Sequence, residues 1–498
     1  MTVVIDRVSG GGGGGGESPP PGGGHGPGLY QKRKAIYPKL AHGSFRRLKW
    51  GLMVVMLAIY YGTPWIRWPR PAGAPSQAVL IDFAHGRFYF FMFDLWPDEV
   101  YFFTGLLVVA ALVLFLATAW LGRLWCGYAC PQTVWTDLFL YVERLFEGDR
   151  NARMRLAKAG WGPDKVLRKG GKHLVWLAIA AATGGAWIFY FEDAPTLFAN
   201  FFAGEASVTA YFSFALLTFT TYVLAGTLRE QVCIYMCPWP RIQGAMVDRH
   251  SLQVTYRHDR GEPRSPHRKG DPWTGRGDCI DCQACVVACP MGIDIRHGSQ
   301  LECINCALCI DACDEIMVKV ERPTGLIGYD SDEAVTRRSQ GLKAIYRPIR
   351  PRIVFYALAL AAVCGLMTWG FLQRTPYQLH VARDRNPLFV RLSDGSIRNS
   401  YSVKLVNRSY QPRTFRVTFA GAPVSRLQSP GLDPDRSGVS VTVASGEQRS
   451  VRLLATVPAD RLTAALTPAT IAARVDDPDA ATPLLTARTM FVSDGAAR

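Results

Sequence analysis

Residues 279–290 read CIDCQACVVACP, and residues 303–314 read CINCALCIDACD. Each stretch has the spacing C-x2-C-x2-C-x3-C, in which three thiolates bind one [4Fe–4S] cube and the fourth thiolate binds the neighbouring cube. The sequence therefore predicts a ferredoxin-like insert that holds two cubes. A pair of zinc knuckles is the alternative, and the two stretches match the ferredoxin spacing far better.

Crossed ligation decides which cysteines belong together. The first cube is assigned to Cys279, Cys282, Cys285 and Cys313, and the second cube to Cys303, Cys306, Cys309 and Cys289. Such a pair indicates one-electron transfer, in which the protein contributes placement and potential rather than organic chemistry. We therefore expect the insert to carry electrons to another site in the chain.

Five apolar segments flank the insert, and each approaches the ~20 residues that a helix needs to cross a hydrocarbon core. They are residues 50–66, 101–122, 174–191, 208–228 and 353–372. The first is marginal, and a buried soluble helix is its alternative. Trp50, Trp65 and Trp68 at its margins favour a span, because indole rings prefer the membrane interface.

Lys and Arg are spread unevenly along the chain, whose formal net charge is +16. Residues 31–49 and 150–172 are rich in Lys and Arg, whereas residues 192–207 contain neither. Cytoplasmic loops of membrane proteins carry the excess of positive charge. The N-terminus and the insert are therefore predicted to be cytoplasmic. Because the predicted number of spans is odd, the C-terminal segment is predicted to lie outside. Since the membrane accounts for the basic loops, no nucleic-acid binding is expected.

A second cysteine pattern occurs twice. Residues 124–133 read LWCGYACPQT and residues 231–240 read QVCIYMCPWP, so Cys126 and Cys130 correspond to Cys233 and Cys237. Both copies follow helices predicted to run inward, which indicates duplicated helical hairpins whose ends meet around a shared axis. If the helix continues through the motif, cysteines at i and i+4 share one face. The proline after each pair should stop the helix.

The four cysteines of these C-x3-C-P motifs are the candidate catalytic residues. Paired thiolates suit a soft ion such as Cu(I), and four could form one shared copper site. Two alternatives stay open: the thiols pack as small buried residues, or they act as redox-active dithiols. The nearby side chains that either orient the site or anchor the chain at the interface are Tyr128, Tyr235, Arg229 and Arg241.

The segment after the last apolar run has a different pattern. Tyr401, Val403 and Leu405 alternate with polar residues, and residues 415–419 and 439–443 repeat this alternation. Period-two patterning with turn residues between the runs indicates an antiparallel β-sandwich. At the other end of the chain, residues 9–28 are rich in Gly and Pro and are predicted to be disordered.

The predicted fold is a membrane α-helical bundle of five spans, with a cytoplasmic two-cluster ferredoxin-like insert and a C-terminal all-β immunoglobulin-like sandwich. The predicted domains are a disordered Gly-rich N-terminus (1–45), a four-helix membrane domain with both C-x3-C-P motifs (46–245), the ferredoxin-like domain (246–350), a fifth membrane helix (351–373) and a periplasmic sandwich (374–498).

The chain resembles the cytochrome c oxidase accessory proteins of bacteria, the FixG/RdxA/CcoG family. The resemblance rests on LWCGYACPQTVWTD, REQVCIYMCPWPRIQGAM, the paired ferredoxin motifs and VARDRNPLFVRLSDGSIRNSY, and it covers nearly the whole chain beyond the Gly-rich head. The C-x3-C-P motifs alone are also similar to those of membrane ferredoxins that serve nitrate or nitrous-oxide respiration. The trailing β-domain separates this chain from those relatives.

The resemblance implies a protein of the bacterial inner membrane that reduces Cu(II) to Cu(I) for assembly of a cbb3-type cytochrome c oxidase. Cys126, Cys130, Cys233 and Cys237 would then handle copper, and oxidase subunits or assembly factors would be the partners. The electron donor, a quinol or a soluble reductant, stays open, as does a homodimer. Two rival functions are a quinol-linked carrier that serves a partner reductase, and a non-enzymatic scaffold for the oxidase.

Overall fold

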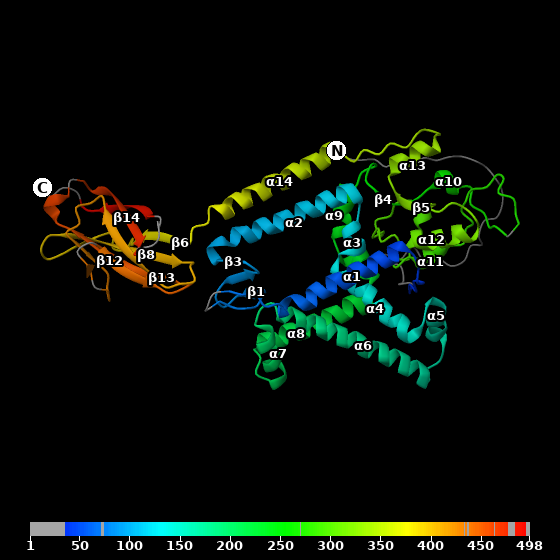
Figure 1. Ribbon diagram of the computed structural model, residues 1–498, viewed down its shortest axis with the longest axis horizontal. Helices are drawn as coiled ribbons and strands as arrows, with labels where there is room; N and C mark the ends of the chain where they lie inside the picture. Colours follow the sequence, from blue (N-terminus) through cyan, green and yellow to red (C-terminus); the bar gives the residue numbers. More distant parts are fainter. Residues whose placement is uncertain are drawn as a thin grey trace, which may run out of the picture.

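The computed structural model describes residues 35–70, 74–268, 270–432, 434–435, 438–462, 464–476 and 484–494. These residues form an elongated molecule of three parts in series (Figure 1). The cysteine-rich insert lies at one end, long helices run through the middle, and a β-sandwich lies at the opposite end. We call these two ends the insert end and the sandwich end.

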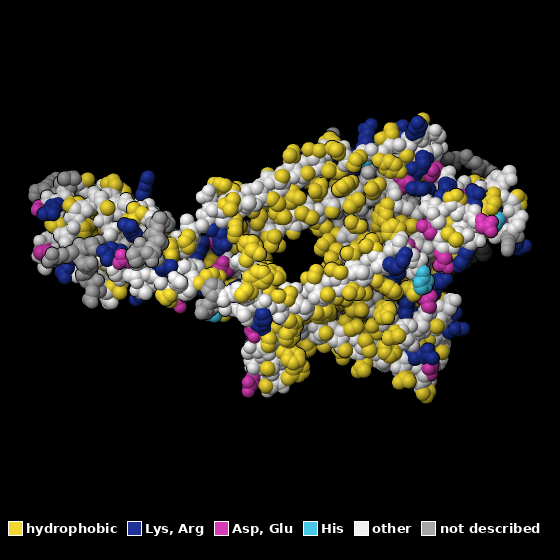
Figure 2. Space-filling view, viewed as in Figure 1, with side chains coloured by type: hydrophobic (Ala, Val, Ile, Leu, Met, Phe, Trp, Pro, Cys, Tyr) yellow, Lys and Arg dark blue, Asp and Glu magenta, His cyan; other side chains and the backbone are white. Residues whose placement is uncertain are grey.

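Long helices make the middle part. They are α1 (Ser44–Gly62), α2 (Val100–Leu121), α6 (Pro163–Ile188), α8 (Val208–Thr221), which continues as the π-helical segment η3 (Tyr222–Leu228), and α14 (Pro351–Leu372). Within the described ranges, three helices are long and apolar enough to cross a membrane: Val100–Leu121, Val208–Leu228 and Pro351–Leu372. Figure 2 shows their apolar side chains as a broad hydrophobic band between two charged ends. Such a band suits hydrocarbon rather than water.

Three of the five expected spans are therefore supported, and the five-span prediction is not confirmed. The other two expected spans, residues 50–66 and 174–191, belong to helices with charged first turns. α1 opens with SFRRLK, and α6 begins at Pro163 rather than near residue 174. Proline is favoured in the first turn of a helix, because its missing N–H would be unpaired there anyway. Asp164 also pairs with Arg168 one turn further on, at 2.8 Å. These features extend α6 beyond its apolar segment.

Short elements connect the long helices. At the insert end these are α3 (Leu124–Tyr128), α4 (Pro131–Glu147), α5 (Arg150–Lys158), η4 (Val232–Met236) and α9 (Trp239–Met246). Towards the sandwich end they are α7 (Ala194–Ala203) and a sheet of β1 (Val79–Asp82), β2 (Arg87–Phe90) and β3 (Phe93–Leu95). Both C-x3-C-P motifs thus lie at the insert end, between a long helix and a short one (Figure 1).

Residues 35–43 pack against the insert, whereas the sequence predicts a disordered head up to residue 45. The predicted Gly-rich part of the head, up to residue 34, lies outside the described residues. The Lys39 amide donates to the Val287 carbonyl at 2.9 Å. Asp311 of the insert accepts hydrogen bonds from the amides of Phe45 and Arg46 at 3.3 and 2.7 Å. An acidic side chain satisfies the free amides at a helix N-terminus and suits its dipole, so Asp311 ties the insert to α1.

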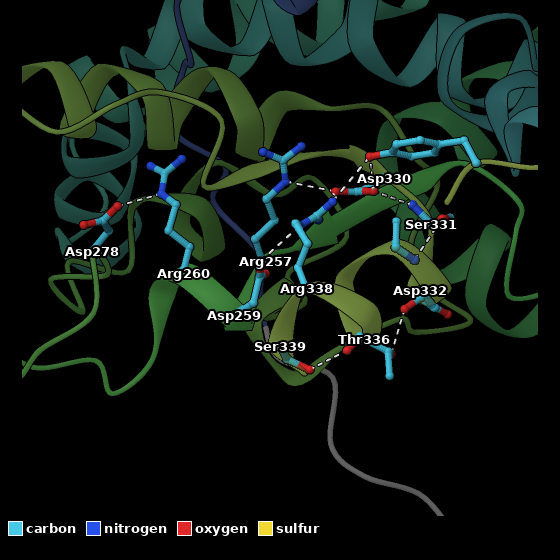
Figure 3. Close-up of polar contacts among 12 residues, drawn as sticks. Arg257, Asp259, Arg260, Asp278, Asp330, Ser331, Asp332, Thr336, Arg338 and Ser339 are labelled. Atoms are coloured by element: carbon cyan, nitrogen blue, oxygen red, sulfur yellow. Dashed lines mark hydrogen bonds and ion pairs between the residues drawn. The ribbon is translucent and has the colours of Figure 1, made fainter. Parts of the chain in front are cut away.

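The insert is built from short helices and one strand pair. Its elements are β4 (Gln253–Tyr256), α10 (His258–Gly261), α11 (Ala284–Ala288), α12 (Leu308–Lys319), β5 (Ile327–Asp330) and α13 (Asp332–Ser339), with β4 antiparallel to β5. Asp330 is fully buried, and it pairs with Arg257 at 3.0 Å and with Arg338 (Figure 3). Asp278 accepts from Arg260 at 2.6 Å. Buried carboxylates need such partners. The ion pairs of Asp330 therefore stabilise the β4–β5 strand pair, and the ion pair of Asp278 holds the residue before Cys279 in place.

The sandwich consists of two five-stranded sheets with the orders β10-β13-β8-β6, with β7 also paired to β8, and β11-β12-β9-β14-β15. The strands are β6 (Tyr377–Arg383), β7 (Val390–Arg391), β8 (Ile397–Asn407), β9 (Arg413–Ala420), β10 (Arg426–Gln428), β11 (Pro434–Asp435), β12 (Gly438–Val443), β13 (Gln448–Val457), β14 (Leu466–Val475) and β15 (Leu485–Val492). Tyr401, Val403 and Leu405 are 0 % exposed. The period-two prediction is confirmed, because alternate residues of a strand face the same side.

Truncation of Phe415 is expected to destabilise the sandwich. Phe415 is 0 % exposed, and its ring lies 5.5 Å from that of Tyr377. Phe415→Ala should lower the free energy of unfolding by about 3–5 kcal/mol, the usual cost of emptying a buried Phe site. Hydrogen exchange of β9 and β12 in denaturant measures this change. Thr414→Ala, at the neighbouring outward position, should cost less than about 1 kcal/mol; equal costs would contradict the assigned core.

Candidate functional site

The loop that carries the second-cube cysteines packs against both C-x3-C-P motifs. One buried cluster joins the two sides of this contact: Cys126, Met291, Ile304, Cys306 and Leu308, with Cys233 and Cys289 packed against it. The first-cube cysteines Cys279, Cys285 and Cys313 belong to a different cluster, made mainly of the insert's own residues. The second cube is therefore the one that would lie beside the motif thiols.

Tyr128 and Arg123 fix this contact with hydrogen bonds to the cluster loop. The Tyr128 hydroxyl donates to the Cys306 carbonyl at 3.2 Å. The Arg123 guanidinium donates to the Cys303 carbonyl at 3.2 Å and to the Pro240 carbonyl at 2.7 Å. A single side chain thus connects the first motif, the cluster loop and the chain just after the second motif.

Gly127 is the point of closest backbone approach. A Cβ atom at Gly127 would lie 2.7 Å from the Ile304 carbonyl oxygen and 3.0 Å from that of Asn305. Backbone atoms cannot move aside cheaply, and overpacking of this kind costs about 1–3 kcal/mol. Gly127→Ala should therefore push the first motif away from the cluster loop. We expect a lower denaturant midpoint for loss of cluster absorbance in this variant.

The matched control for Gly127 is Gly160→Ala, because a Cβ atom there meets nothing within 4 Å. This control should keep the wild-type midpoint. A Gly127→Ala protein as stable as the control would show that the first motif does not press against the cluster loop.

All four motif cysteines line one cavity of about 310 Å³. Its sulfur and polar lining comprises Cys126, Cys130, Cys233, Cys237, Arg123, Gln132, Thr133 and Glu302. The two copies meet at one place, as the duplication predicts. Among the described residues, neither these four thiols nor the cluster cysteines of the insert already stand together as a group of three or more metal-binding side chains. The donor type and the lining of each site therefore indicate what it can bind.

Gln243 is a site residue that lies in the stretch REQVCIYMCPWPRIQGAM, although no ligand spacing singles it out. It is 0 % exposed, its Oε1 accepts from the Cys126 thiol at 3.1 Å, and its Nε2 donates to Thr118 Oγ1 at 3.3 Å. Burial raises the pKa of the Cys126 and Cys233 thiols to about 12. Both thiols are therefore protonated at neutral pH in the metal-free protein, and a bound metal would displace the protons.

The helical turn of each motif ends before the second cysteine, so the condition under which positions i and i+4 would share a helix face is not met. Cys130 (φ −63°, ψ 128°) and Cys237 (φ −82°, ψ 122°) have extended backbones. A following proline disfavours the helical conformation of the residue before it. Pro131 then opens α4, since the first helical position favours proline. Each pair is therefore held by a turn.

The two motifs differ in their surroundings. Tyr128 is 5 % exposed, whereas its counterpart Tyr235 is 72 % exposed. The second motif is held by Arg229, whose guanidinium pairs with Glu143 at 2.9 Å. Burial raises the pKa of Glu143, but Arg229 and neighbouring cations outweigh it and lower the value to about 2. Arg241 is exposed. Of the four candidate orienting residues, Tyr128 and Arg229 therefore hold the motifs in place.

Cys313 lies close enough to the other three first-cube cysteines for their charges to affect it. Burial raises the pKa of the Cys313 thiol, and Cys285, Cys282 and Cys279 raise it further. Cys313 follows the second motif in sequence yet lies with the cysteines of the first, as crossed ligation requires. Among these four, Cys282 is exposed and the others are buried.

The second-cube cysteines form a matching set. Burial raises the pKa of the Cys309 thiol, and Cys306, Cys303 and Cys289 raise it further. These cysteines line one small hollow together with Cys285 and apolar side chains. Four thiols around an apolar hollow are the donors that a [4Fe–4S] cube takes, so the residues of both sets fit the two expected cubes.

Three family models match the chain. Residues 228–332 match a 4Fe–4S dicluster domain, residues 102–148 match a 4Fe–4S binding domain, and residues 367–494 match the IG-like fold at the C-terminal of FixG. The nitrogen fixation protein FixG of Rhizobium meliloti (strain 1021) is 50 % identical over 465 residues, which cover 88 % of this chain and 88 % of that protein. This chain belongs to the FixG family.

Other relatives agree with this assignment. Protein RdxA of Cereibacter sphaeroides is 50 % identical over 457 residues, or 90 % of this chain and 95 % of that protein. Protein RdxB of the same organism is 49 % identical over 429 residues, or 85 % and 89 %. The crystal structure of a FixG-related protein from Vibrio parahaemolyticus covers 24 % of this chain and 99 % of its own, at 21 % identity and a TM-score of 0.20. The 4Fe–4S family models and the FixG-family membership together make this chain an iron–sulfur protein with electron-transfer chemistry.

The match over residues 102–148 includes the first C-x3-C-P motif, although this range contains only the cysteines Cys126 and Cys130. A cube takes four thiolates. In this FixG-family protein, Cys233 and Cys237 are the thiols that could complete such a set, because they line the same cavity. An iron–sulfur cluster is therefore a rival occupant to copper.

Proposed function

We propose that this FixG-family protein reduces Cu(II) to Cu(I) and supplies Cu(I) for assembly of a cbb3-type cytochrome c oxidase. The observation that carries the proposal is the single cavity lined by all four C-x3-C-P thiols, in contact with the loop of the second-cube cysteines. Soft thiolate ligands select Cu(I). A copper ion in this cavity is thus drawn to its reduced state beside a source of electrons.

Each Cu(II) ion takes up one electron and leaves as Cu(I). The bound iron–sulfur pair supplies this electron when reduced. Tyr128 and Arg123 keep the Cys303–Cys306 loop at a fixed place against the first motif. Gln243 positions the Cys126 thiol in the metal-free protein by accepting its S–H hydrogen bond. This bond would be lost when copper binds, because the displaced thiol protons leave to water. The residues of the chain therefore position the copper ion and its electron source. Only an electron passes between the two, and no atom is transferred.

We place the insert and both motifs in the cytoplasm of a bacterium, and the sandwich in the periplasm. Two features support this orientation: the basic stretches 39–49 and 150–158 lie at the insert end, and apolar helices separate that end from the sandwich. Positive charge is retained on the cytoplasmic side. The sandwich is then available to oxidase subunits or their assembly factors outside the membrane.

An iron–sulfur cube at the four motif thiols is the second candidate, because a 4Fe–4S model matches the segment that contains the first motif. Two cubes give about eight irons per chain, and a third cube would give about twelve. Iron analysis of anaerobically purified protein separates the candidates. About eight irons support the copper proposal, and about twelve support a third cube.

The proposal is tested in cells whose own FixG-family genes are deleted. The wild-type chain should restore both cbb3-type oxidase activity and the copper content of the purified oxidase. A chain with serine at positions 126, 130, 233 and 237 should restore neither. An oxidase that is fully loaded with copper in the deletion strain would reject the proposal. Restoration by the serine variant would favour the scaffold function, since a scaffold does not need the thiols.

A further inference from the structure

The first-cube cysteines reach the surface of the insert at one edge. Cys282 is the exposed residue among the eight cluster cysteines, and its neighbours Asp281 and Gln283 are exposed as well. The second-cube cysteines, in contrast, are buried or half-buried, and two of them, Cys306 and Cys289, pack beside the motif thiols. Electrons delivered at the thiol cavity must enter the protein elsewhere, and the Cys282 edge is where the first cube would lie nearest to solvent.

A basic loop begins and ends beside this cube. Residues 260–277 read RGEPRSPHRKGDPWTGRG, with five Lys and Arg against two Asp and Glu. The Asp278 amide donates to the Arg260 carbonyl at 3.0 Å, which closes the loop. The Ser265 amide donates to the Cys279 carbonyl at 3.3 Å. The loop is thus attached to the backbone of a first-cube cysteine.

Two of the four arginines in this loop, Arg268 and Arg276, form no ion pair with a carboxylate of the described residues. Arg260 is paired with Asp278, as Figure 3 shows. Arg276 donates instead to the backbone carbonyls of Ser265 and Pro266, and its guanidinium lies 5.1 Å from the centre of the Trp273 ring. Arg264 lies 3.8 Å from the Glu262 carboxylate, at the long end of the ion-pair range, and Arg268 is exposed.

We propose that the uptake surface, defined as Arg264, Arg268, Arg276 and the exposed edge at Cys282, docks a soluble acidic protein that carries a one-electron flavin or iron–sulfur centre. The donor loses one electron, the first cube gains it, and no atom changes place. Opposite charges steer such encounters and raise their rates. A small, transient contact is enough for a redox partner.

A soluble donor fits this surface better than a membrane quinol. The first-cube cysteines pack among Val254, Tyr256 and Met317 of the insert. The cysteines that pack with the motif thiols are Cys306 and Cys289 of the second cube. A quinol in the apolar band would approach the second cube, where electrons leave the pair of cubes, rather than the first cube, where they enter. This inference rests on the proposed function only for the direction of electron flow, from the first cube to the motif thiols.

The test uses the full-length protein in lipid nanodiscs, with both cubes loaded and no copper present. Reduced flavodoxin, an acidic one-electron donor, is mixed with it anaerobically, and cube reduction is followed by absorbance in a stopped-flow instrument. The second-order rate should fall about tenfold or more as salt is raised, because salt screens the opposite charges. Oxidised ¹⁵N-labelled flavodoxin reports binding without electron transfer, through NMR line broadening.

The test variant is Arg264→Glu/Arg268→Glu, and the control is Lys343→Glu/Arg347→Glu. Both control residues are exposed in the connector before α14, and both variants change the charge equally. The test variant should lose about tenfold in rate at low salt together with the NMR broadening, while the control stays within about twofold. The neutral variant Arg264→Gln/Arg268→Gln should give an intermediate rate, and it replaces the Glu variant if that protein fails to hold its iron.

Two results would overturn the proposal: equal flavodoxin rates for test and control variants, or fast cube reduction by a quinol in the nanodisc with no flavodoxin binding. Because the experiment contains no copper, a failure here leaves copper reduction untouched. A failure of copper reduction would likewise leave the docking result standing.

Discussion

Replacement of Cys126, Cys130, Cys233 and Cys237 by serine is expected to abolish Cu(II) reduction while both cubes stay loaded. Serine is similar in size to cysteine, but its oxygen is not a soft ligand for Cu(I). Loss of a single outer partner of a metal ligand costs about 10- to 100-fold, so loss of all four ligands should slow Cu(I) formation more than about 100-fold. The measurement is Cu(I) trapped by a chelator after anaerobic reduction of the cubes.

The matched control is Cys364→Ser, which removes a thiol that lies exposed on α14 and outside the motif cavity. This variant should form Cu(I) at the wild-type rate. Iron content must be equal in all three proteins for the comparison to hold. A quadruple variant that forms Cu(I) as fast as the control would remove the C-x3-C-P motifs from the mechanism.

Loss of the second cube should stop copper reduction, whereas loss of the first cube should only reduce its yield. The reason is position: Cys306 belongs to the cluster that contains Cys126, while Cys285 belongs to the other cluster. After chemical reduction, Cys306→Ala should slow Cu(I) formation by more than about 100-fold, because a ligand matters more than an outer partner. Cys285→Ala should still give about one Cu(I) per chain from the electron stored in the second cube.

Iron analysis and electron paramagnetic resonance (EPR) of the reduced proteins decide whether each variant has lost one cube and kept the other. The expected order of activity is wild type, then Cys285→Ala, then Cys306→Ala. The reverse order of the two variants would mean that the first cube supplies the copper site, in conflict with the packing around Cys126.

Local signals in the sequence predicted much of this structure. Ligand spacing identified the two cluster motifs, and alternation at Tyr401, Val403 and Leu405 identified a sandwich, because each pattern repeats within a few residues. The duplicated motif also predicted a meeting of segments about a hundred residues apart. Contacts without a repeat gave no such signal. Gln243 meets Cys126 across 117 positions, and Asp311 meets Arg46 across 265.

The backbone conformation of the C-x3-C-P motifs depends on two local preferences that oppose each other. The i, i+4 spacing of Cys126 and Cys130 favours a shared helix face, but the proline that follows favours an extended residue before it, and this preference prevails at Cys130. Tyr128 and Tyr235 differ because the Tyr128 hydroxyl donates to the Cys306 carbonyl of the insert, whereas the Tyr235 side chain stays exposed. A duplicated sequence cannot reveal which of the two tyrosines the insert covers.

The central claim is that electrons pass from the cubes to copper at the motif thiols. The most direct measurement is rapid freeze-quench EPR of the reduced wild-type protein mixed with Cu(II) under anaerobic conditions. Reduced cubes and Cu(II) are both paramagnetic, whereas oxidised cubes and Cu(I) give no EPR signal. The account predicts that the two signals disappear together, one Cu(II) for each reduced cube. A Cu(II) signal that persists beside fully reduced cubes would contradict it.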